Sequence, residues 1–320
     1  MMNIPPYLDD ARIDALLDVP GCVSALDAAF TDLAHGRAAV QARHRRDCGA
    51  VKLSTMGALW PQRQVAGVKA YTTVAGQFSF LVTLFDTAAN RPLALLEANT
   101  LTRLRTSALA SLVAGKALRS GARKLALFGA GLQGRAQTEA MLALQRFDEV
   151  AVVDPKGSPA WCAELAAQHD CRVSLCEAPE AVRGAQLILT ATRSKTPVFD
   201  GAWLEPGAVV IATGTSLPDG TELDNATLQR ASRVLVEWKP QSLVEAGEVV
   251  LGLSSGALDS DRIADLVDLY AGRTAWRESD DDIVVFKSVG IGLADVACGW
   301  LALERSGLAN RSVAPNHAAL

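Results

Sequence analysis

The segment Phe128-Gly-Ala-Gly-Leu-Gln-Gly134 constrains the fold more than any other part of the sequence. An apolar run, Leu125–Phe128, precedes three glycines with the spacing G-x-G-x-x-G, and a helical pattern from Leu132 to Gln145 follows. A strand, a glycine turn and a helix in this order hold a dinucleotide, because the free N–H groups of the helix N-terminus face the pyrophosphate. The sequence therefore predicts a dinucleotide site in a parallel α/β fold, and the long segment before it needs another role.

The pattern of short apolar runs and helical segments continues after this turn. Ser158-Pro159 offers an N-cap and a first-turn proline for a helix through Gln168. Further strands are expected at 149–154, 172–175, 186–190, 208–212, 233–236 and 283–286. Strands that alternate with helices favour a doubly wound Rossmann domain, which we place at residues 119–286.

The first 118 residues have a different pattern. Ser79–Asp86 and Pro92–Ala98 flank a short turn and predict an antiparallel hairpin, and Gln64–Val74 resembles another strand. Helices are expected at 11–17, 23–35 and 104–118. We interpret this segment as an α+β domain for substrate binding or assembly.

Composition excludes several classes of protein. A net charge of −4 and a pI near 5.6 leave no basic field, so nucleic acid is not an expected partner. No apolar run is long enough to span a bilayer, and the start of the chain lacks the basic and apolar regions of a signal peptide. Six scattered cysteines without a C-x-x-C pair indicate reduced thiols in a cytoplasmic protein, and the four histidines lack metal-ligand spacing, so no metal is expected.

The expected cofactor follows from four residues. Gly129 permits the tight turn, Gly131 lets the backbone approach the pyrophosphate, and Gly134 allows the helix to pack closely on the strand. Asp154, at the end of the next strand, suits the ribose hydroxyls and favours NADH. Lys156 could neutralise a 2′-phosphate, so NADPH remains possible, and Asp154 could also be a turn residue before Pro155.

Three cations in the first domain are candidates for an anion site. Lys69 lies inside an apolar strand, and Arg105 stands near the start of the helix expected at 104–118, where a positive charge opposes the helix dipole. Arg43 is the third cation. Such a placement suggests an anionic ligand, although isolated cations are often solvated surface residues.

At the level of these motifs, the chain resembles the ornithine cyclodeaminase/μ-crystallin family along nearly its whole length. The matching segments follow in order: Gly67–Lys69, Leu84–Asp86, Leu101–Ala108, Phe128–Gly134, Thr190–Ser194, Gly207–Thr215, Glu222–Asp224, Glu245–Glu248 and Phe286–Gly290.

The resemblance implies a substrate and dimerisation domain formed by residues 1–118 and 287–320, and a homodimer built from its sheets. It also implies roles for individual residues. Arg43, Lys69 and Arg105 would hold a substrate carboxylate. Thr106 and Gln133 would lie near the cofactor phosphates, and Thr192, Ser288, Val289 and Gly290 beside the nicotinamide. Asp295 matches a family acid, or is an ordinary polar residue of the last helix.

One departure from the family bears on the reaction. Members that convert ornithine to proline have an aspartate two residues after the glycine that ends the fifth strand, and here that position is Ser216. A serine hydroxyl is a poor acid or base near neutral pH without a partner. Asp219 is close in sequence, but Pro218-Asp219-Gly220 reads as a turn.

The favoured function is therefore the other main activity of the family, the NAD(P)H-dependent reduction of a cyclic ketimine. The substrate would be Δ1-pyrroline-2-carboxylate or Δ1-piperideine-2-carboxylate, and the product L-proline or L-pipecolate. Lys69 is a candidate proton relay, and Ser216 occupies the position that decides the reaction. An alanine-type amino-acid dehydrogenase, an ornithine cyclodeaminase and a non-catalytic NAD(P)H- or ligand-binding protein remain as alternatives.

Overall fold

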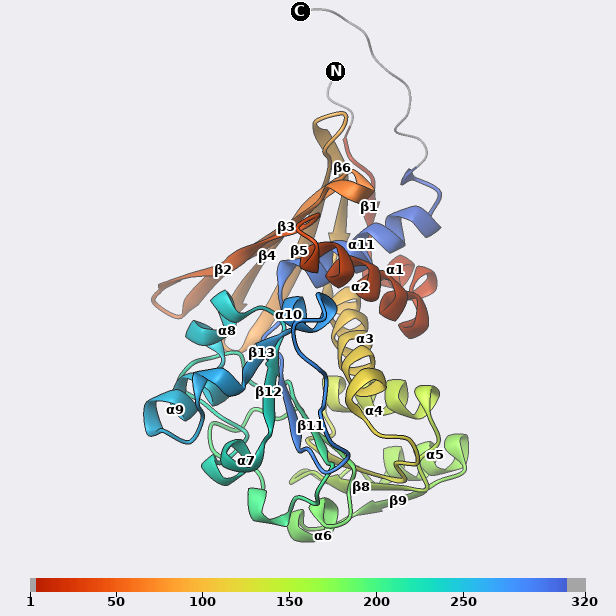
Figure 1. The fold of residues 1–320 in the computed structure, drawn as a ribbon. Helices are drawn as coiled ribbons and strands as arrows, with labels where there is room; N and C mark the ends of the chain where they lie inside the picture. The colour runs from red at the N-terminus through yellow and green to blue at the C-terminus, as the bar shows by residue number, and fades with distance from the viewer. Residues whose placement is uncertain (1–3, 310–320) are drawn as a thin grey trace, which may run out of the picture. The chain divides into compact units, whose positions relative to one another are not determined.

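The computed structural model describes residues 4–309, and the chain divides into two compact units (Figure 1). The first unit comprises residues 1–105 and 291–320, and the second comprises residues 106–290. Residues 1–3 and 310–320, which include His317 and the end of the expected C-terminal segment, lie outside the described part. The helix α3 (Asn99–Ala117) begins in the first unit and continues in the second.

The first unit is built on a six-stranded sheet with the order β1-β6-β5-β4-β3-β2. Neighbouring strands are antiparallel, except that β1 pairs with β6 in parallel. The strands are β1 (Tyr7–Leu8), β2 (Ala39–Cys48), β3 (Val51–Trp60), β4 (Val65–Val74), β5 (Gln77–Asp86) and β6 (Arg91–Glu97), with a 3-10 turn at Pro61–Arg63. The predicted hairpin is confirmed as β5 and β6, which pair antiparallel.

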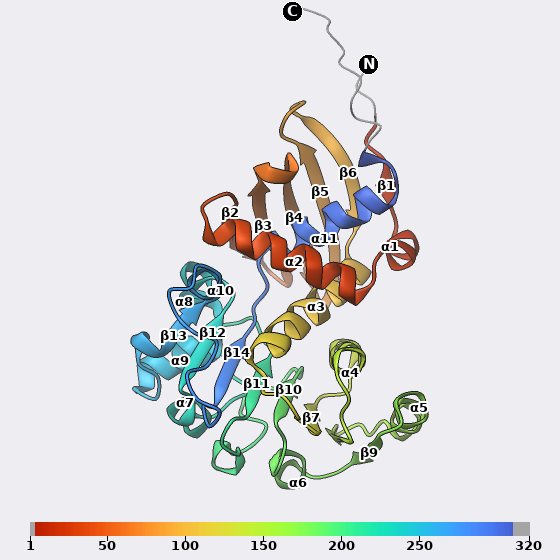
Figure 2. The same ribbon diagram turned by 45° about the vertical axis from the view of Figure 1, so that its right-hand side comes forward.

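Two helices cover one face of this sheet. They are α2 (Val19–Ala34) and α11 (Gly292–Arg305), and a short helix, α1 (Asp10–Leu16), precedes them (Figure 2). The approach of α11 is close, because a Cβ at Gly292 would lie 2.4 Å from the carbonyl oxygen of Gly57 in β3. Glycine at this position therefore lets the helix backbone contact the strand.

The second unit contains an eight-stranded parallel sheet with the order β13-β12-β14-β11-β10-β7-β8-β9. The strands are β7 (Lys124–Phe128), β8 (Glu149–Val153), β9 (Arg172–Leu175), β10 (Leu187–Thr190), β11 (Val209–Ala212), β12 (Arg233–Val236), β13 (Ile263–Asp265) and β14 (Val284–Lys287). The strands β8 and β9 lie on one side of β7 in this sheet, and the chain then returns so that β10 pairs with the other side of β7. In open parallel sheets, ligands bind beyond the carboxyl ends of the strands at such a switch point.

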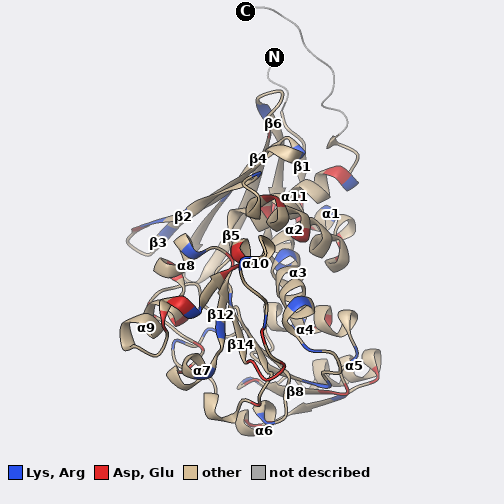
Figure 3. Cartoon of the chain, in the orientation of Figure 1, with Lys and Arg blue, Asp and Glu red and all other residues tan. Residues whose placement is uncertain are grey.

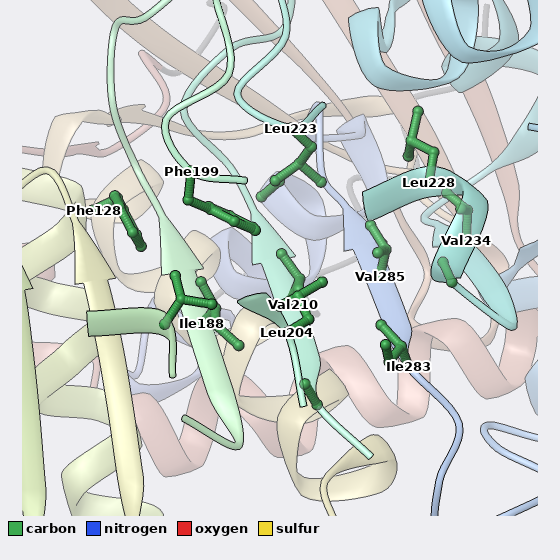
Figure 4. Packing of buried hydrophobic residues seen from close by; sticks show 14 of the residues in the cluster. Phe128, Ile188, Phe199, Leu204, Val210, Leu223, Leu228, Val234, Ile283 and Val285 are labelled. Carbon is green, nitrogen blue, oxygen red and sulfur yellow. The ribbon is translucent and has the colours of Figure 1, made fainter. Parts of the chain in front are cut away.

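Helices connect these strands and complete the doubly wound fold that the sequence predicts. They are α4 (Leu132–Leu144), α5 (Pro159–His169), α6 (Ala178–Val182), α7 (Asn225–Arg230), α8 (Lys239–Glu245), α9 (Gly247–Ser255) and α10 (Leu266–Tyr270), with 3-10 turns at Gly201–Trp203 and Ser260–Arg262. A core of strand residues such as Ile188, Val210 and Val285 packs against Phe128 and Phe199 (Figure 4). Parallel strands buried on both faces have continuous apolar sequences, which explains why the other strands of this sheet were predicted, whereas the three-residue β13 was not.

Three local predictions need correction. The helix α2 begins at Val19 rather than Val23, because Pro20 is tolerated in the first turn and Asp18 caps it by accepting from the N–H of Gly21. The helix α3 begins at Asn99, so Arg105 lies in its second turn. The dipole argument for Arg105 is therefore wrong, since that effect is confined to the first turn.

The hairpin of β2 and β3 was not among the predicted strands. Its first strand, β2, lies at the sheet edge and carries mostly polar and charged side chains, so it lacks an apolar alternation.

Lys, Arg, Asp and Glu are interspersed along the described chain (Figure 3). None of the helices in residues 4–309 has the length and apolar character that a bilayer crossing requires.

Candidate active site

The glycine turn after β7 has the geometry of a pyrophosphate cradle. Gly129 adopts a φ of +89°, which favours glycine, and its N–H donates to the carbonyl of Val153 at 2.9 Å. A Cβ at Gly134 would lie 2.0 Å from the carbonyl oxygen of Gly129, so only glycine permits this packing of α4 on the turn. At Gly131, the N-cap of α4, an added Cβ would meet no atom within 4 Å. Open space at a helix N-terminus fits a dinucleotide phosphate.

Asp154 follows β8 and lies in a small polar network. Its Oδ2 accepts a hydrogen bond from the hydroxyl of Ser158 at 2.9 Å, and its Oδ1 lies 3.4 Å from the N–H of Lys156. Ser158 is the N-cap residue of α5 as predicted, but its side chain makes no capping bond because it turns toward Asp154. The side chain of Lys156 is exposed. Asp154 is half-buried and able to meet a ribose hydroxyl.

A buried carboxylate, Glu222, holds the loops that follow β10 and β11. Its Oε1 accepts from the backbone N–H and the hydroxyl of Thr192, at 2.7 and 2.8 Å, and its Oε2 accepts from the N–H of Gly214 at 2.7 Å. The backbone N–H of Glu222 donates in turn to Glu248, which forms an ion pair of 2.8 Å with Lys287. Glu222, Glu248 and Lys287 are all fully buried. The conformation of Thr192 is therefore fixed by its hydrogen bonds to the buried Glu222.

A second buried carboxylate, Glu237, holds the turn after β14. Its Oε1 accepts from the hydroxyl of Ser288 at 2.5 Å and from the N–H of Gly290 at 2.8 Å, and its Oε2 accepts from the N–H of Val289 at 3.2 Å. The amide of Gln241 donates to the carbonyl of Gly290 at 2.7 Å. The predicted segment 288–290 thus has a fixed conformation. Its backbone N–H groups already donate to protein oxygens, so a ligand would contact other atoms of this segment.

Sequence reasoning missed the roles of Glu222 and Glu237. Glu237 directly follows the apolar run of β12, and Glu222 opens a segment that carries the family resemblance. An acid directly after a buried parallel strand lies at the ligand-binding edge of the sheet, and this signal could have identified Glu237.

In the first unit, Lys69 of β4 is the centre of a buried charge cluster. Its Nζ donates to Oδ1 of Asp295 in α11 at 2.9 Å and to the hydroxyl of Thr102 at 2.5 Å, and it lies 4.4 Å from the centroid of the Phe80 ring. The Nε of Arg105 forms a 3.3 Å ion pair with the same Asp295 oxygen. The structure therefore brings together two of the cations that were predicted to bind an anion, Lys69 and Arg105, and shows that Asp295 is their counter-ion.

Arg43 of β2 completes this cluster electrostatically. Its Nη2 lies 3.2 Å from the sulfur of Met56, and its charge lowers the pKa values of both Lys69 and Asp295. Arg43, Lys69 and Arg105 thus gather positive charge around the Asp295 carboxylate, an arrangement that suits an anionic ligand. Lys69 is buried with its ammonium already paired, whereas Arg43 is half-buried.

The pKa values of the paired groups are shifted by burial and by their neighbours. Burial, together with the charges of Arg105 and Arg43, lowers the pKa of Lys69 to about 8, although Asp295 opposes this shift. Burial alone would raise the pKa of Asp295, but the charges of Lys69 and Arg105 outweigh it and lower the pKa. At neutral pH the cluster therefore contains an ionised carboxylate and an ammonium that titrates close to the physiological range.

The remaining candidate residues lie in the second unit. Ser216 is half-buried after β11, while Asp219 is exposed in the turn at 218–219 and pairs with Lys195 at 2.9 Å. Gln133 lies in the first turn of α4, and its Oε1 is buried without a hydrogen-bond partner in the described chain. Thr106 is buried in α3.

These features define a class of protein, a doubly wound dinucleotide-binding protein whose additional α+β unit carries a buried cation cluster. The family model described as "Ornithine cyclodeaminase/mu-crystallin family" matches residues 7–308. The chain belongs to the ornithine cyclodeaminase/mu-crystallin family, as the order of its motifs predicts.

Two relatives are named as reductases. The chain is 32% identical to a Delta(1)-pyrroline-2-carboxylate reductase of Bacillus cereus over 250 residues, which cover 77% of this chain and 74% of the relative. It is 34% identical to the ketimine reductase mu-crystallin of Mus musculus over 224 residues, which cover 70% of this chain and 68% of the relative.

Solved structures of similar chains have the same fold. A probable ornithine cyclodeaminase from Bordetella pertussis Tohama I superposes with a TM-score of 0.92 at 42% identity, covering 98% of this chain and 99% of that one. An archaeal alanine dehydrogenase dimer with bound NAD superposes with a TM-score of 0.89 at 25% identity, covering 96% and 97%.

Proposed function

We propose that this protein is an NAD(P)H-dependent oxidoreductase that reduces a cyclic ketimine carboxylate. The preferred substrate is Δ1-pyrroline-2-carboxylate, which yields L-proline, and the six-membered Δ1-piperideine-2-carboxylate is the homologous candidate. The observation that carries this proposal is the group of cations, Arg43, Lys69 and Arg105, that surrounds the Asp295 carboxylate in a chain with a dinucleotide turn. The names of the relatives from Bacillus cereus and Mus musculus agree with it.

The cluster suits the anionic part of such a substrate. We propose that Arg43 and Arg105 bind the carboxylate, because a guanidinium donates two parallel hydrogen bonds to carboxylate oxygens. This contact fixes the orientation of the adjacent C=N carbon. Reduction adds one hydride to that carbon and one proton to the nitrogen, and the reduced dinucleotide supplies the hydride when bound.

The proton has a candidate source in Lys69. An ammonium with a pKa of about 8 is protonated at neutral pH and still able to release its proton. Thr102 and Asp295 hold its Nζ. We propose that the ammonium of Lys69 supplies the proton to the imine nitrogen of the substrate, while Asp295 keeps the ammonium in place.

The cyclodeaminase alternative lacks its acid in this chain. Ser216 stands where the cyclising members have an aspartate, and Asp219 is exposed and paired with Lys195. The carboxylate of Asp219 is therefore paired with a lysine of the segment that follows β10. This favours reduction of an imine over cyclisation of ornithine.

We also propose NADH as the preferred cofactor. The carboxylate of Asp154 is placed to accept hydrogen bonds from ribose hydroxyls and would repel a 2′-phosphate. Gly129, Gly131, Gly134, Gln133 and Thr106 would surround the phosphates. Thr192, with Ser288, Val289 and Gly290, would border the nicotinamide, held by Glu222 and Glu237.

For the assembly we propose a homodimer in the cytoplasm. All six cysteines are free thiols, as a reducing compartment requires. The face of the first unit's sheet that does not face α2 and α11 exposes large apolar side chains at Val51, Leu53, Leu59, Leu81 and Phe85. A second copy of the chain would cover this face.

One assay tests the proposed reaction. Purified protein and NADH are mixed separately with Δ1-pyrroline-2-carboxylate, Δ1-piperideine-2-carboxylate, pyruvate with ammonium, and L-ornithine with NAD⁺. We expect NADH oxidation with the cyclic imines and proline as the product of the first. Oxidation with pyruvate and ammonium alone would favour an alanine-type dehydrogenase. Tight NADH binding without turnover in any mixture would reject an enzymatic role.

A further inference from the structure

Arg135, a cation that was not among the predicted site residues, lies beside the glycine turn and close to Asp154. Arg135 of α4 follows the third glycine of the fingerprint, and its Nε donates to the carbonyl of Ala130 at 2.8 Å. Its guanidinium carbon lies 5.2 Å from the centroid of the Trp161 ring, a cation–π contact. These two contacts hold the guanidinium in one place on the turn.

The same guanidinium is linked to Asp154 through a single hydroxyl. Nη2 of Arg135 donates to Oγ of Ser158 at 3.0 Å, and that hydroxyl donates to Oδ2 of Asp154 at 2.9 Å. Ser158 is buried, whereas Arg135 and Asp154 are half-buried. Nη1 of Arg135 makes no hydrogen bond to any residue in the range 4–309. A positive donor with unused N–H groups therefore borders the acid that would meet the ribose.

Within the proposed function, we propose that Arg135 makes the cofactor site tolerant of a 2′-phosphate, so that this protein uses NADPH as well as NADH. Asp154 would meet the 2′-hydroxyl, and in NADPH the phosphate is attached to that same oxygen. The carboxylate disfavours the phosphate, and the guanidinium offsets this repulsion with charge-assisted hydrogen bonds. The two side chains together set the ratio of the two affinities.

Lys156 was the cation that the sequence indicated for this purpose, and the structure favours Arg135 instead. The Lys156 side chain is exposed, and its backbone N–H, rather than its ammonium, lies near Asp154. A flexible exposed ammonium has to be ordered before it can bind a ligand, which costs side-chain entropy. Arg135 is already held by Ala130, Ser158 and Trp161.

The test measures binding of adenosine fragments and needs no turnover. Dissociation constants for 2′,5′-ADP and 5′-AMP are determined by calorimetry for the unmodified protein and for Arg135→Gln, Arg135→Lys, Lys156→Gln and Asp154→Ala. Arg146→Gln is the matched control, because it removes one exposed arginine from the same unit, 68% exposed and away from Asp154. NADH and NADPH are then titrated by fluorescence, and thermal unfolding checks each variant.

We expect Arg135→Gln to weaken 2′,5′-ADP and NADPH by about ten- to a hundredfold, while 5′-AMP and NADH change by less than about threefold. Arg135→Lys should retain part of the affinity for the phosphorylated ligands. Asp154→Ala should strengthen NADPH relative to NADH, and Lys156→Gln and Arg146→Gln should leave the ratio unchanged.

Three outcomes would overturn the assignment. They are an unchanged ratio in Arg135→Gln, an equal loss of both fragments, and a loss that appears in Lys156→Gln instead. Each of these can occur while NADH still binds and imine reduction continues, so failure of this inference differs from failure of the proposed function. Loss of NADH and 5′-AMP binding by the unmodified protein would reject the dinucleotide site itself, together with this inference.

Discussion

The Nζ of Lys69 lies 2.9 Å from Oδ1 of Asp295, and each of the two side chains is 1% exposed. The lysine belongs to a strand of the sheet and the aspartate to the last helix, which packs on that sheet. Asp295 also faces Arg105 at 3.3 Å, so one carboxylate compensates two buried cations.

Asp295→Asn should destabilise the protein by about 3–5 kcal/mol, because it leaves Lys69 and Arg105 buried without their counter-ion. Chemical denaturation measures the change. The control is Asp14→Asn, which removes the partner of Arg103 at a site where Asp14 is 59% exposed, and should cost at most about 1 kcal/mol. An equal decrease in the free energy of unfolding in both variants would mean that the buried ion pair contributes no more to stability than the exposed one.

The rate of imine reduction should fall as the pH rises through about 8, because Lys69 loses its proton and its positive charge there. The ammonium is the active form, so the decrease lies on the alkaline side, and kcat/KM should drop about tenfold per pH unit. In Lys69→Arg the guanidinium stays protonated, and the alkaline limb should move to higher pH or disappear. An identical pH profile for both proteins would assign the limb to the substrate.

Arg43→Ala and Arg105→Ala should each raise KM for the imine by about one to two decades, since each loses a hydrogen bond to a carboxylate worth about 1.5–3 kcal/mol. Lys69→Ala should also reduce kcat/KM. The dissociation constant of NADH should stay the same in all three. Arg46→Ala, an exposed neighbour on β2, is the control and should behave like the unmodified enzyme. Near-normal kcat/KM in all three variants would mean that these cations do not bind the substrate.

The protein should not convert L-ornithine to proline at a measurable rate, because Ser216 cannot exchange protons with the amine near neutral pH. Ser216→Asp should lower imine reduction, since a new carboxylate would repel the carboxylate of the substrate. Product analysis of ornithine and imine reactions for both proteins measures these changes. Robust cyclisation by the unmodified protein would contradict the argument and implicate Asp219.

Light scattering at micromolar concentration should give the mass of a dimer. The exposed apolar face of the first unit's sheet is the expected interface, so Leu53→Glu and Leu81→Glu should yield monomers by placing charges in it. Leu251→Glu alters an exposed leucine of α9 in the other unit and should leave the mass unchanged. A monomeric mass for the unmodified protein would reject the dimer.

Much of the fold could be predicted because local patterns specify it. The strands β7, β8 and β11 are short apolar runs, and such runs indicate burial on both faces of a parallel sheet. The strand β2 was not predicted, because an edge strand rich in arginine has no such signal. Helix starts were misplaced where proline or polar residues opened the first turn, as in α2.

The sequence by itself determined the dinucleotide turn and the position of Asp154, because both depend on spacing within one strand-turn-helix unit. It also determined the identity of the three cations. Only the tertiary structure decided that Asp295 pairs with Lys69, 226 positions away in the chain, and that Glu222 and Glu237 fix the loops after the strands. A polar side chain in a helix or after a strand has the same sequence pattern whether it meets water or a buried partner. The fold removes water from these groups, and their charges then have to be compensated by residues that the sequence places far apart.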